Sequence, residues 1–339
     1  MHEDLLIEES IVRRRLPLNL NPDDLHLFSN ELEKTIASVK CLRYQNIVGC
    51  PNGVLIQSGS LVPESLAIPN MGFFSNLKLY LKCISRNSRP WNSQRFDQPG
   101  IWVTDNWSSG YFHWVADALP RLWVMRKYLA EATLLLPGEL KDFDYIKESL
   151  KPFQIKDVIF LDKATTVKNL LLASHVAPTG NYNEKVMQSI RELFLKYFLE
   201  NNTGANERVY VSRAKAAKRK IVNESEVADL LIKYGFKTVY FEDISFKEQV
   251  NISRRTKYFI SNHGAGMTNI MFMQPGANVL EFRKINDFQN NCYFSLASAL
   301  NLNYFYQLCK PENSNEFTHT ANLIVDLKQL EMNVKLMLS

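Results

Sequence analysis

The sequence has few of the residues that mark special classes of protein. Its 339 residues include only 13 glycines and 13 prolines, which excludes collagen-like and low-complexity chains. The five cysteines are odd in number and form no Cys-x-x-Cys pair, so we expect reduced thiols. No apolar run approaches the roughly 18 residues that a membrane helix needs, and the first residues are acidic where a secretory signal is basic. We therefore expect a globular, cytoplasmic protein.

Length and charge limit the protein less sharply. A chain of 339 residues suits two domains, because a single hydrophobic core stops growing well before this length. The net charge of +5 is compatible with a phosphate-bearing small molecule, an anionic membrane surface or weak contact with nucleic acid. Charge alone selects none of these partners, and we expect no nucleic acid among them.

Apolar periodicity divides the chain into three parts. Residues 1–95 are rich in Asn, Ser and Pro and predict an irregular segment with only brief strands between turns. In residues 96–200 short apolar runs alternate with helical patterns, which predicts a Rossmann-like arrangement. The polar stretch 201–207 is expected to link two domains, residues 1–200 and residues 207–339.

The last part of the chain alternates most regularly between strand and helix. Its strands are unbroken apolar runs, as expected when helices cover both faces of a parallel sheet. The sequence thus predicts an α/β fold with a doubly wound sheet, in which ligands bind beyond the carboxyl ends of the strands. The expected strands are 208–212, 237–241, 258–261 and 278–282, and the expected helices are 224–234, 245–254 and 266–273.

The turn after the strand at 258–261 is a candidate anion site. The run Ile260-Ser-Asn-His-Gly-Ala-Gly-Met-Thr-Asn places His263, Gly264 and Gly266 between a strand and the start of a helix. Backbone N–H groups and the helix dipole favour a phosphate there. A plain tight turn is the alternative. The run lacks the third glycine of a dinucleotide fingerprint, and the chain has no Gly-x4-Gly-Lys loop.

Two further strand ends carry charged side chains. Glu281 is expected at the end of the strand 278–282, where a carboxylate can accept hydrogen bonds from a ribose diol. Arg213 follows the strand 208–212 and can grip a diphosphate with two hydrogen bonds, which Lys does less well. A solvated strand end and a solvated basic loop are the alternatives.

His113 and Asp117 are four residues apart on a predicted helix near 110–130, so they share one face. They are close enough to hydrogen-bond or to converge on one substrate hydroxyl, and Pro120 should kink the helix near Asp117. A polar pair is costly to bury without a purpose, although a satisfied core pair is an alternative. Asp142 and Asp144 match a metal-binding Asp-x-Asp pattern, but they begin an amphipathic helix, where acidic residues favour the dipole. We expect no metal site.

At these motifs the sequence resembles the glycosyltransferase 61 family, over roughly residues 100–285. The family implies a GT-B-like architecture of two Rossmann-like, doubly wound domains that face a cleft. It also implies an inverting, metal-independent transfer of a pentose, a hexose or an N-acetylhexosamine from a UDP-linked donor, without a cofactor. The matching elements are Tyr111-Phe-His-Trp-Val-Ala-Asp-Ala-Leu-Pro-Arg, Ser212-Arg with Arg219 and Asn223-Glu224, and His263-Gly-Ala-Gly-Met-Thr-Asn with Pro275-Gly and Val279-Leu-Glu.

The resemblance also implies a role for each matching residue. Arg213, Arg219 and the turn at His263 would hold the diphosphate, and Glu281 the ribose. Asp117, oriented by His113, would deprotonate the acceptor hydroxyl; His113 as the base, with Asp117 fixing its tautomer, is an open alternative. The nucleotide-binding set is Arg213, Arg219, Asn223, Glu224, His263, Gly264, Ala265, Gly266, Thr268, Asn269 and Glu281.

Residues 1–95 match the family poorly, so the acceptor is the least defined part of the expectation. The lack of a membrane anchor, which many eukaryotic members carry, indicates a bacterial, cytosolic form. We expect it to act on a glycan or lipid-linked acceptor in surface-polysaccharide synthesis, such as capsule or lipopolysaccharide, with contact at the inner face of the membrane. Two alternatives stay open: a non-catalytic scaffold of a polysaccharide assembly complex, and a nicotinamide-dependent oxidoreductase or epimerase, against which the incomplete glycine fingerprint argues.

Overall fold

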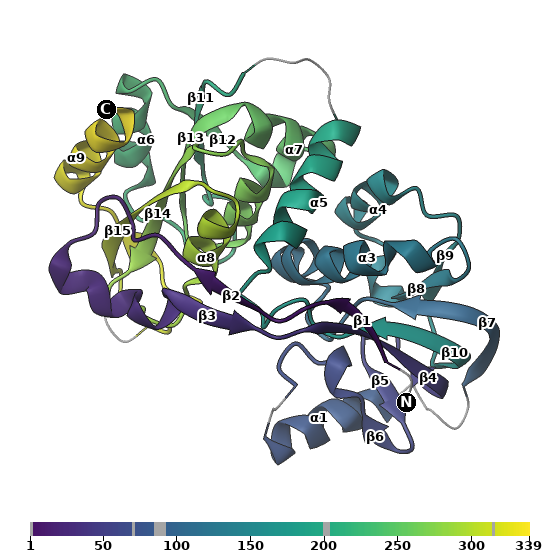
Figure 1. Cartoon of the computed structure of the whole chain (residues 1–339). Coiled ribbons are helices and arrows are strands. Elements are labelled where there is room, and N and C mark those ends of the chain that lie inside the picture. The colour runs from purple at the N-terminus through teal and green to yellow at the C-terminus, as the bar shows by residue number, and fades with distance from the viewer. Residues whose placement is uncertain (1–2, 70–71, 85–92, 199–203, 314–315) are drawn as a thin grey trace. The chain divides into compact units, whose positions relative to one another are not determined.

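The computed structural model describes residues 3–69, 72–84, 93–198, 204–313 and 316–339 (Figure 1). The chain divides into two compact units, which we describe separately. Unit 1 contains Met1–Ser10 and Thr35–Val186, and unit 2 contains Ile11–Lys34 and Met187–Ser339. The expected linker at 201–207 has its first three residues outside the described part. None of the helices in that part combines the length and apolarity needed to span a bilayer.

Unit 1 is built on a mixed sheet. Its described strands are β1 (Asp4–Ile7), β4 (Val39–Gly49), β5 (Leu55–Gln57), β6 (Ser60–Leu61), β7 (Gln94–Trp102), β8 (Thr133–Pro137), β9 (Val158–Leu161) and β10 (Thr165–Ala173). They lie in the order β6, β5, β4, β10, β7, β8, β9, and β1 pairs with β4. The four strands β10, β7, β8 and β9 are parallel to one another. The others join antiparallel.

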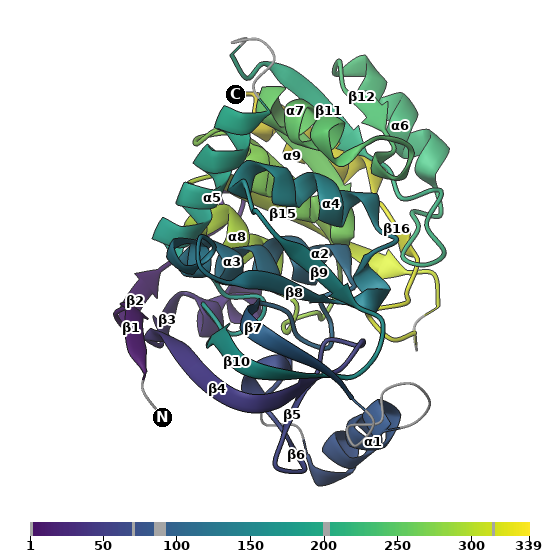
Figure 2. The same cartoon turned by 90° about the vertical axis from the view of Figure 1, so that its right-hand side faces the viewer.

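The N-terminal part is more regular than expected. β4 is 11 residues long and pairs with β10 along nearly its whole length, so that β4, β10 and β7 lie side by side (Figure 2). Asn46 adopts a left-handed conformation with φ of 53°, and its position is skipped in the pairing. This irregularity breaks the apolar alternation, which is why the sequence indicated only short fragments of the strand.

One helical segment of unit 1 is irregular where it packs near the parallel strands. The expected helix near 110–130 is a composite: a π-helical turn at Trp114–Ala118 separates α2 from α3. Pro120, in the first turn of α3, has no N–H to give to the preceding turn. Pro120 was expected to kink the helix near Asp117, and the structure has a π-helical turn at this place. The helices are α1 (Phe73–Ile84), α2 (Tyr111–His113), α3 (Leu119–Met125) and α4 (Asp144–Leu150).

A buried arginine joins two strand ends in unit 1. Arg121 of α3 is 1% exposed and donates hydrogen bonds to the carbonyl of Ala173 at the end of β10 (Nε, 3.1 Å) and of Thr104 after β7 (Nη1, 3.4 Å). Burial lowers the pKa of Arg121 to about 10, against the opposing effect of Asp105. Because β7 and β10 are adjacent and parallel, these bonds hold the carboxyl ends of the two strands together.

Unit 2 contains the regular half of the chain. Its described strands are β11 (Glu207–Val211), β12 (Lys237–Val239), β13 (Thr256–Asn262), β14 (Asn278–Lys284), β15 (Asn303–Pro311) and β16 (Leu323–Ile324). Its helices are α5 (Glu184–Tyr197), which begins just before the division, α6 (Glu224–Lys233), α7 (Phe246–Arg255), α8 (Cys292–Ala299), α9 (Leu327–Leu338) and a 3₁₀ helix at Ala265–Phe272. The strands β2 (Ser10–Arg13) and β3 (Glu33–Ile36) form a separate pair.

The sheet of unit 2 is doubly wound. Its order is β12, β11, β13, β14, β15, β16, and the first five strands are parallel. Counted along the chain, the parallel strands lie in the order 2-1-3-4-5, which is the flavodoxin-like order and not that of a dinucleotide-binding Rossmann sheet. α6 and α9 pack on one face of this sheet, and their apolar side chains form a hydrophobic core with those of the strands. Separately from that core, Phe194 of α5, Phe246 of α7 and Phe272 pack together in an aromatic cluster. The predicted α/β class is confirmed.

His175 should make the stability of the protein pH-dependent. Its Nε2 lies 3.0 Å from the carbonyl oxygen of Leu66, and burial, helped by the charge of Arg121, lowers the pKa of His175 from 6.5 to about 4. Between these values the unfolded chain binds the proton and the folded chain does not. The free energy of unfolding should therefore fall by up to about 3 kcal/mol as the pH drops from about 6.5 to about 4.

The variant His175→Gln keeps an N–H donor but does not titrate in this range. We expect its unfolding free energy, measured by urea denaturation, to depend less on pH than that of the wild type. The same pH dependence in the two proteins would contradict this role of His175.

Candidate active site

Unit 2 has a topological switch point between β11 and β13. These strands are hydrogen-bonded neighbours, and the sheet order reverses between them. In doubly wound sheets ligands bind outside the carboxyl ends of the strands at this point. Ser212 and Arg213 follow β11, and His263 and Gly264 follow β13. The fold therefore brings together two of the sequence-predicted strand ends.

Gly264 allows Arg213 to lie against the turn after β13. A Cβ added at Gly264 would come within 2.6 Å of Arg213 Nη1 and 2.8 Å of its Cζ. Gly264 has φ of 166°, which any residue adopts, so its place depends on this close approach and not on backbone freedom. The absence of a side chain at Gly264 therefore makes room for the guanidinium of Arg213.

A second arginine lies beside the first. Arg219 has a left-handed backbone (φ 59°), and its carbonyl accepts a hydrogen bond from the Asn262 side chain at the end of β13. Burial and the nearby Arg219 charge lower the pKa of Arg213. The Nε atoms of both arginines are buried without a hydrogen-bond partner among the described residues. Two adjacent cations with unused donors are costly unless an anion binds them.

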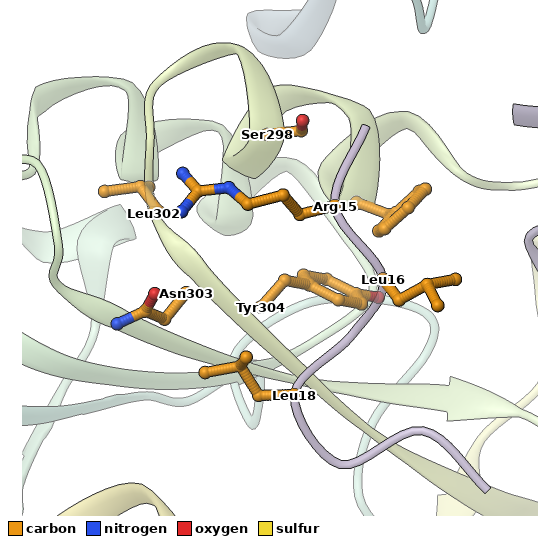
Figure 3. A pocket seen from close by; sticks show the side chains of 8 residues that line it. Arg15, Leu16, Leu18, Ser298, Leu302, Asn303 and Tyr304 are labelled. Carbon is orange, nitrogen blue, oxygen red and sulfur yellow. The ribbon is translucent and has the colours of Figure 1, made fainter. Parts of the chain in front are cut away.

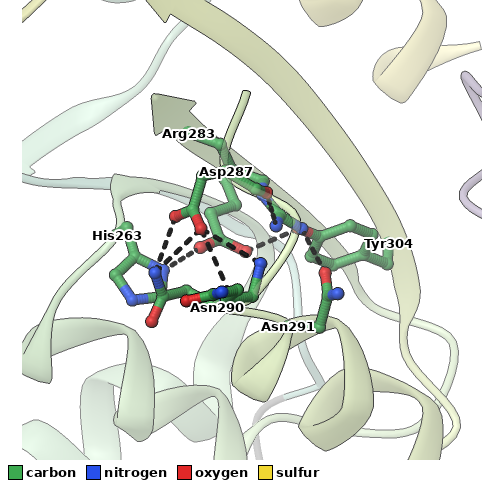
Figure 4. Close-up of polar contacts among 8 residues, drawn as sticks. His263, Arg283, Asp287, Asn290, Asn291 and Tyr304 are labelled. Atoms are coloured by element: carbon green, nitrogen blue, oxygen red, sulfur yellow. Dashed lines mark hydrogen bonds and ion pairs between the residues drawn. The ribbon is translucent and has the colours of Figure 1, made fainter. Parts of the chain in front are cut away.

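The imidazole ring of His263 is oriented by a contact with the carboxylate of Glu281. Its Nδ1 lies 2.5 Å from Glu281 Oε1, and Tyr304 donates to Glu281 Oε2 at 2.5 Å (Figure 4). Glu281 is 0% exposed and lies inside β14, not at its end as expected, so the sequence placed the strand end too early. In this conformation the two oxygens of the carboxylate face internal donors.

Arg283 completes this buried network. It donates to Asn291 Oδ1 at 2.8 Å, to the carbonyl of Asp287 at 2.9 Å and to the Tyr304 hydroxyl at 3.4 Å. Burial and the Glu281 charge raise the pKa of Tyr304 well above its ordinary value, so Tyr304 stays a donor. Arg283, Tyr304 and Asn291 are functional candidates that sequence reasoning missed. The sequence offered one signal for this network. Arg283 is two residues from Glu281 on the same strand, so their side chains lie on the same face.

The other predicted nucleotide-binding residues make internal contacts. Asn223 stands at the N-cap position of α6, but its side chain makes no cap bond to the helix and instead bonds the backbone N–H and carbonyl of Val325. Glu224 accepts from Tyr210 at 2.7 Å, and buried Asn269 donates to Gln249. Thr268 is fully buried, and Ala265 and Gly266 begin the 3₁₀ helix, which was expected as an α-helix.

The predicted polar pair of unit 1 is formed. His113 Nδ1 lies 2.8 Å from Asp117 Oδ2, and the same oxygen accepts a 2.8 Å hydrogen bond from Thr179. The His113 side chain is 23% exposed and that of Asp117 7%. Because Nδ1 is engaged with Asp117, Nε2 is the ring nitrogen available to a substrate. The ring of Trp107 lies 5.0 Å from that of His113.

Thr179 and Trp107 are the members of this cluster that sequence reasoning missed. Thr179 lies beyond the end of β10, and Trp107 lies beyond the end of β7, the neighbouring parallel strand. Both residues could therefore have been found by looking for polar or aromatic residues that follow adjacent parallel strands. The register of β10 against β7 could not be read from the sequence.

A shallow pocket of unit 2 lies elsewhere, at the start of β15 (Figure 3). Leu16 and Leu18 of the N-terminal segment line it together with Asn303 and Tyr304. Its volume of about 30 Å³ suits about two water molecules and is too small for a nucleotide. Within the described ranges no three His, Cys, Asp or Glu side chains gather as a metal site would require.

This chain is similar to known proteins over a region that contains most of these residues. Residues 111–280, half of the chain, match the family described as Glycosyltransferase 61. The EGF domain-specific O-linked N-acetylglucosamine transferase of Bos taurus is 31% identical over 110 residues, which are 31% of this chain and 20% of that protein. The protein of the same name from Drosophila melanogaster is 34% identical over 98 residues, 28% of this chain and 18% of that protein. The match thus spans about a fifth of the length of these relatives.

The matched region includes His113, Asp117 and Thr179 in unit 1 and Arg213, Arg219 and His263 in unit 2, and it ends one residue before Glu281. Since the family match covers half of the chain and the central residues of the two clusters, this protein belongs to the glycosyltransferase 61 family.

Proposed function

We propose that this protein is a glycosyltransferase that moves a sugar from a nucleoside diphosphate donor, UDP-linked, to an acceptor hydroxyl. The observation that carries the proposal is the arginine pair at the switch point of unit 2. Within the described part of the chain, Arg213 and Arg219 each bury an Nε atom without a hydrogen-bond partner, and the charge of Arg219 lowers the pKa of Arg213. A diphosphate would supply the missing negative charge and acceptors.

The same pair supports transfer without a metal. When the bond from the anomeric carbon to the diphosphate breaks, the leaving oxygen gains negative charge. Two guanidinium groups at this place can stabilise that charge, as a divalent cation does in other transferases. The turn at His263 and Gly264 would contribute backbone and side-chain donors beside them.

For the base we propose His113, with Asp117 and Thr179 as its positioning residues. Asp117 is the more buried member of the pair and accepts from two donors, so it suits fixing the tautomer better than contacting a substrate. Nε2 of His113 would take the proton of the acceptor hydroxyl as its oxygen attacks the anomeric carbon. The bond to the diphosphate breaks on the opposite side, and the anomeric configuration inverts.

We also propose the domain arrangement, the sugar, the acceptor and the cellular location. We place the two units in a GT-B arrangement, with the donor on unit 2 and the acceptor on unit 1. The names of the two relatives assign them N-acetylglucosamine as the sugar and EGF domains as the acceptor. For this chain we propose a pentose, a hexose or an N-acetylhexosamine as the sugar. We propose a glycan or lipid-linked acceptor in bacterial surface-polysaccharide synthesis, in the cytoplasm at the inner face of the membrane.

Removing Arg213 should weaken nucleotide binding. We expect Arg213→Ala to raise the dissociation constant for UDP, measured by calorimetry with EDTA present, about 10- to 100-fold, because a charge-assisted contact is lost. Lys215→Ala removes a cation from the same loop that is paired with Asp243, and it should leave the affinity unchanged. Equal effects of the two variants would contradict the site. A wild type that binds no nucleotide would favour a scaffold.

The variant Gly264→Ala tests the contact between the glycine and the guanidinium. A Cβ at 2.6 Å must displace the end of the Arg213 side chain. Because that end is flexible, we expect little change in the thermal unfolding midpoint but a loss of UDP affinity of about tenfold or less. Unchanged affinity would show that UDP binding does not depend on the close approach of the Arg213 guanidinium to Gly264.

The His113 cluster should act on turnover and not on donor binding. We expect His113→Ala to reduce the release of UDP from the tightest-binding nucleotide sugar, in the presence of a panel of glycan acceptors, by about 100-fold or more. Asp117→Asn should lower the same rate at least about tenfold, because the amide can stabilise the wrong tautomer. UDP affinity should stay at the wild-type value. Turnover that survives both changes would exclude this cluster as the base.

A further inference from the structure

The loop that follows β15 presents an aromatic pair to solvent. Phe317 is 70% exposed, and its ring lies 5.1 Å from the ring of His319 at an angle of 57°. The backbone N–H groups of Thr320 and Ala321 donate to the carbonyl of Phe317, which makes a compact turn of this part of the loop. The two rings are thus held together although the phenylalanine is largely exposed.

This loop is tied to the loop that carries Arg213 and Arg219. Lys220 donates its N–H to Asn322 Oδ1 at 3.0 Å, and Leu323 donates to the carbonyl of Lys220 at 2.9 Å. Val222 in turn donates to the carbonyl of Leu323 at 2.8 Å. Lys220 is the neighbour of Arg219 in the chain. The hydrogen bonds therefore place the aromatic loop beside the arginine pair, within the same unit.

Electrostatics indicate the same neighbourhood. Burial lowers the pKa of His319, and the charges of His263 and Arg219 lower it further, whereas Asp287 acts in the opposite direction. His319 is therefore within electrostatic reach of the turn after β13 and of the arginine pair. A ligand bound through its phosphates to Arg213 and Arg219 would have its remaining groups within reach of this loop.

We propose that Phe317 and His319 form the surface on which the nucleobase of the donor stacks. The inference rests on the proposed function and assigns a part of the donor that the arginine pair does not explain. A nucleobase has two flat faces that stack on aromatic rings whatever the base, and stacking requires no matched set of hydrogen bonds. An exposed phenylalanine packed on a histidine provides such a surface, and a bound base would cover the apolar ring.

The loop after β14 carries a second exposed ring, which makes the assignment testable by comparison. Phe288 is 55% exposed and follows Asp287, the carboxylate that acts on His319. It has the same chemistry as Phe317 and lies after the neighbouring parallel strand. Among the residues that the structure describes, no histidine ring packs on Phe288, so we assign the base to Phe317.

The experiment compares the binding of UDP and of inorganic pyrophosphate by calorimetry, in EDTA, to the wild type, Phe317→Ala, Phe317→Trp and Phe288→Ala. We expect the wild type to bind UDP more tightly than pyrophosphate. Phe317→Ala should weaken UDP binding about 5- to 100-fold and leave pyrophosphate binding unchanged, because only the stacked ring is removed. Phe317→Trp should restore UDP affinity, and Phe288→Ala should match the wild type.

Other outcomes separate this inference from the function on which it rests. If Phe317→Ala binds UDP like the wild type, or if it loses UDP and pyrophosphate equally, the stacking surface is excluded while the arginine site stands. A loss of UDP affinity in Phe288→Ala alone would move the base to the other loop and overturn the assignment. A wild type that binds neither ligand contradicts the proposed function as well.

Discussion

The guanidinium of Arg213 lies against the bare Cα of Gly264, and the anion site of unit 2 is arranged around this contact. The contact joins the ends of β11 and β13, the two strands between which the sheet order reverses. The Nε atoms of Arg213 and Arg219 are buried there, and no described residue hydrogen-bonds to them. Stability alone does not explain such a pair, since unpaired buried donors and adjacent like charges both cost free energy. A bound diphosphate removes both costs, which is why we place the donor there.

The two candidate clusters use the same chemical device in different local structures. In each, a carboxylate binds Nδ1 of a partly buried histidine and leaves Nε2 as the nitrogen available to a ligand. In unit 1 the carboxylate of Asp117 comes from the same helical stretch, four residues away, across a π-turn. In unit 2 Glu281 comes from the neighbouring strand β14 and is itself held by Tyr304. This arrangement fits the proposed reaction. His113 would remove a proton from the acceptor, and His263 would help to stabilise the negative charge on the donor diphosphate.

Much of unit 2 was predictable from the sequence because its strands are continuous apolar runs bounded by polar turns. The pair of His113 and Asp117 followed from helical spacing alone. The long strand β4 was not recognised, because Asn46 interrupts its alternation, and β15 was missed as a strand. Contacts between distant segments were also out of reach. The fit of Gly264 to Arg213 depends on which strands are neighbours, and Thr179 reaches Asp117 only because β10 lies beside β7. The contact between Glu281, inside β14, and His263 was likewise not foreseen from the sequence.

A crystal structure of the protein with UDP, grown in the presence of EDTA, tests the central claim most directly. We predict phosphate oxygens within hydrogen-bond distance of the guanidinium groups of Arg213 and Arg219, beside the turn at His263 and Gly264, with no metal ion between them. A diphosphate bound away from this turn, or one that becomes ordered only after a divalent cation is added, would contradict it.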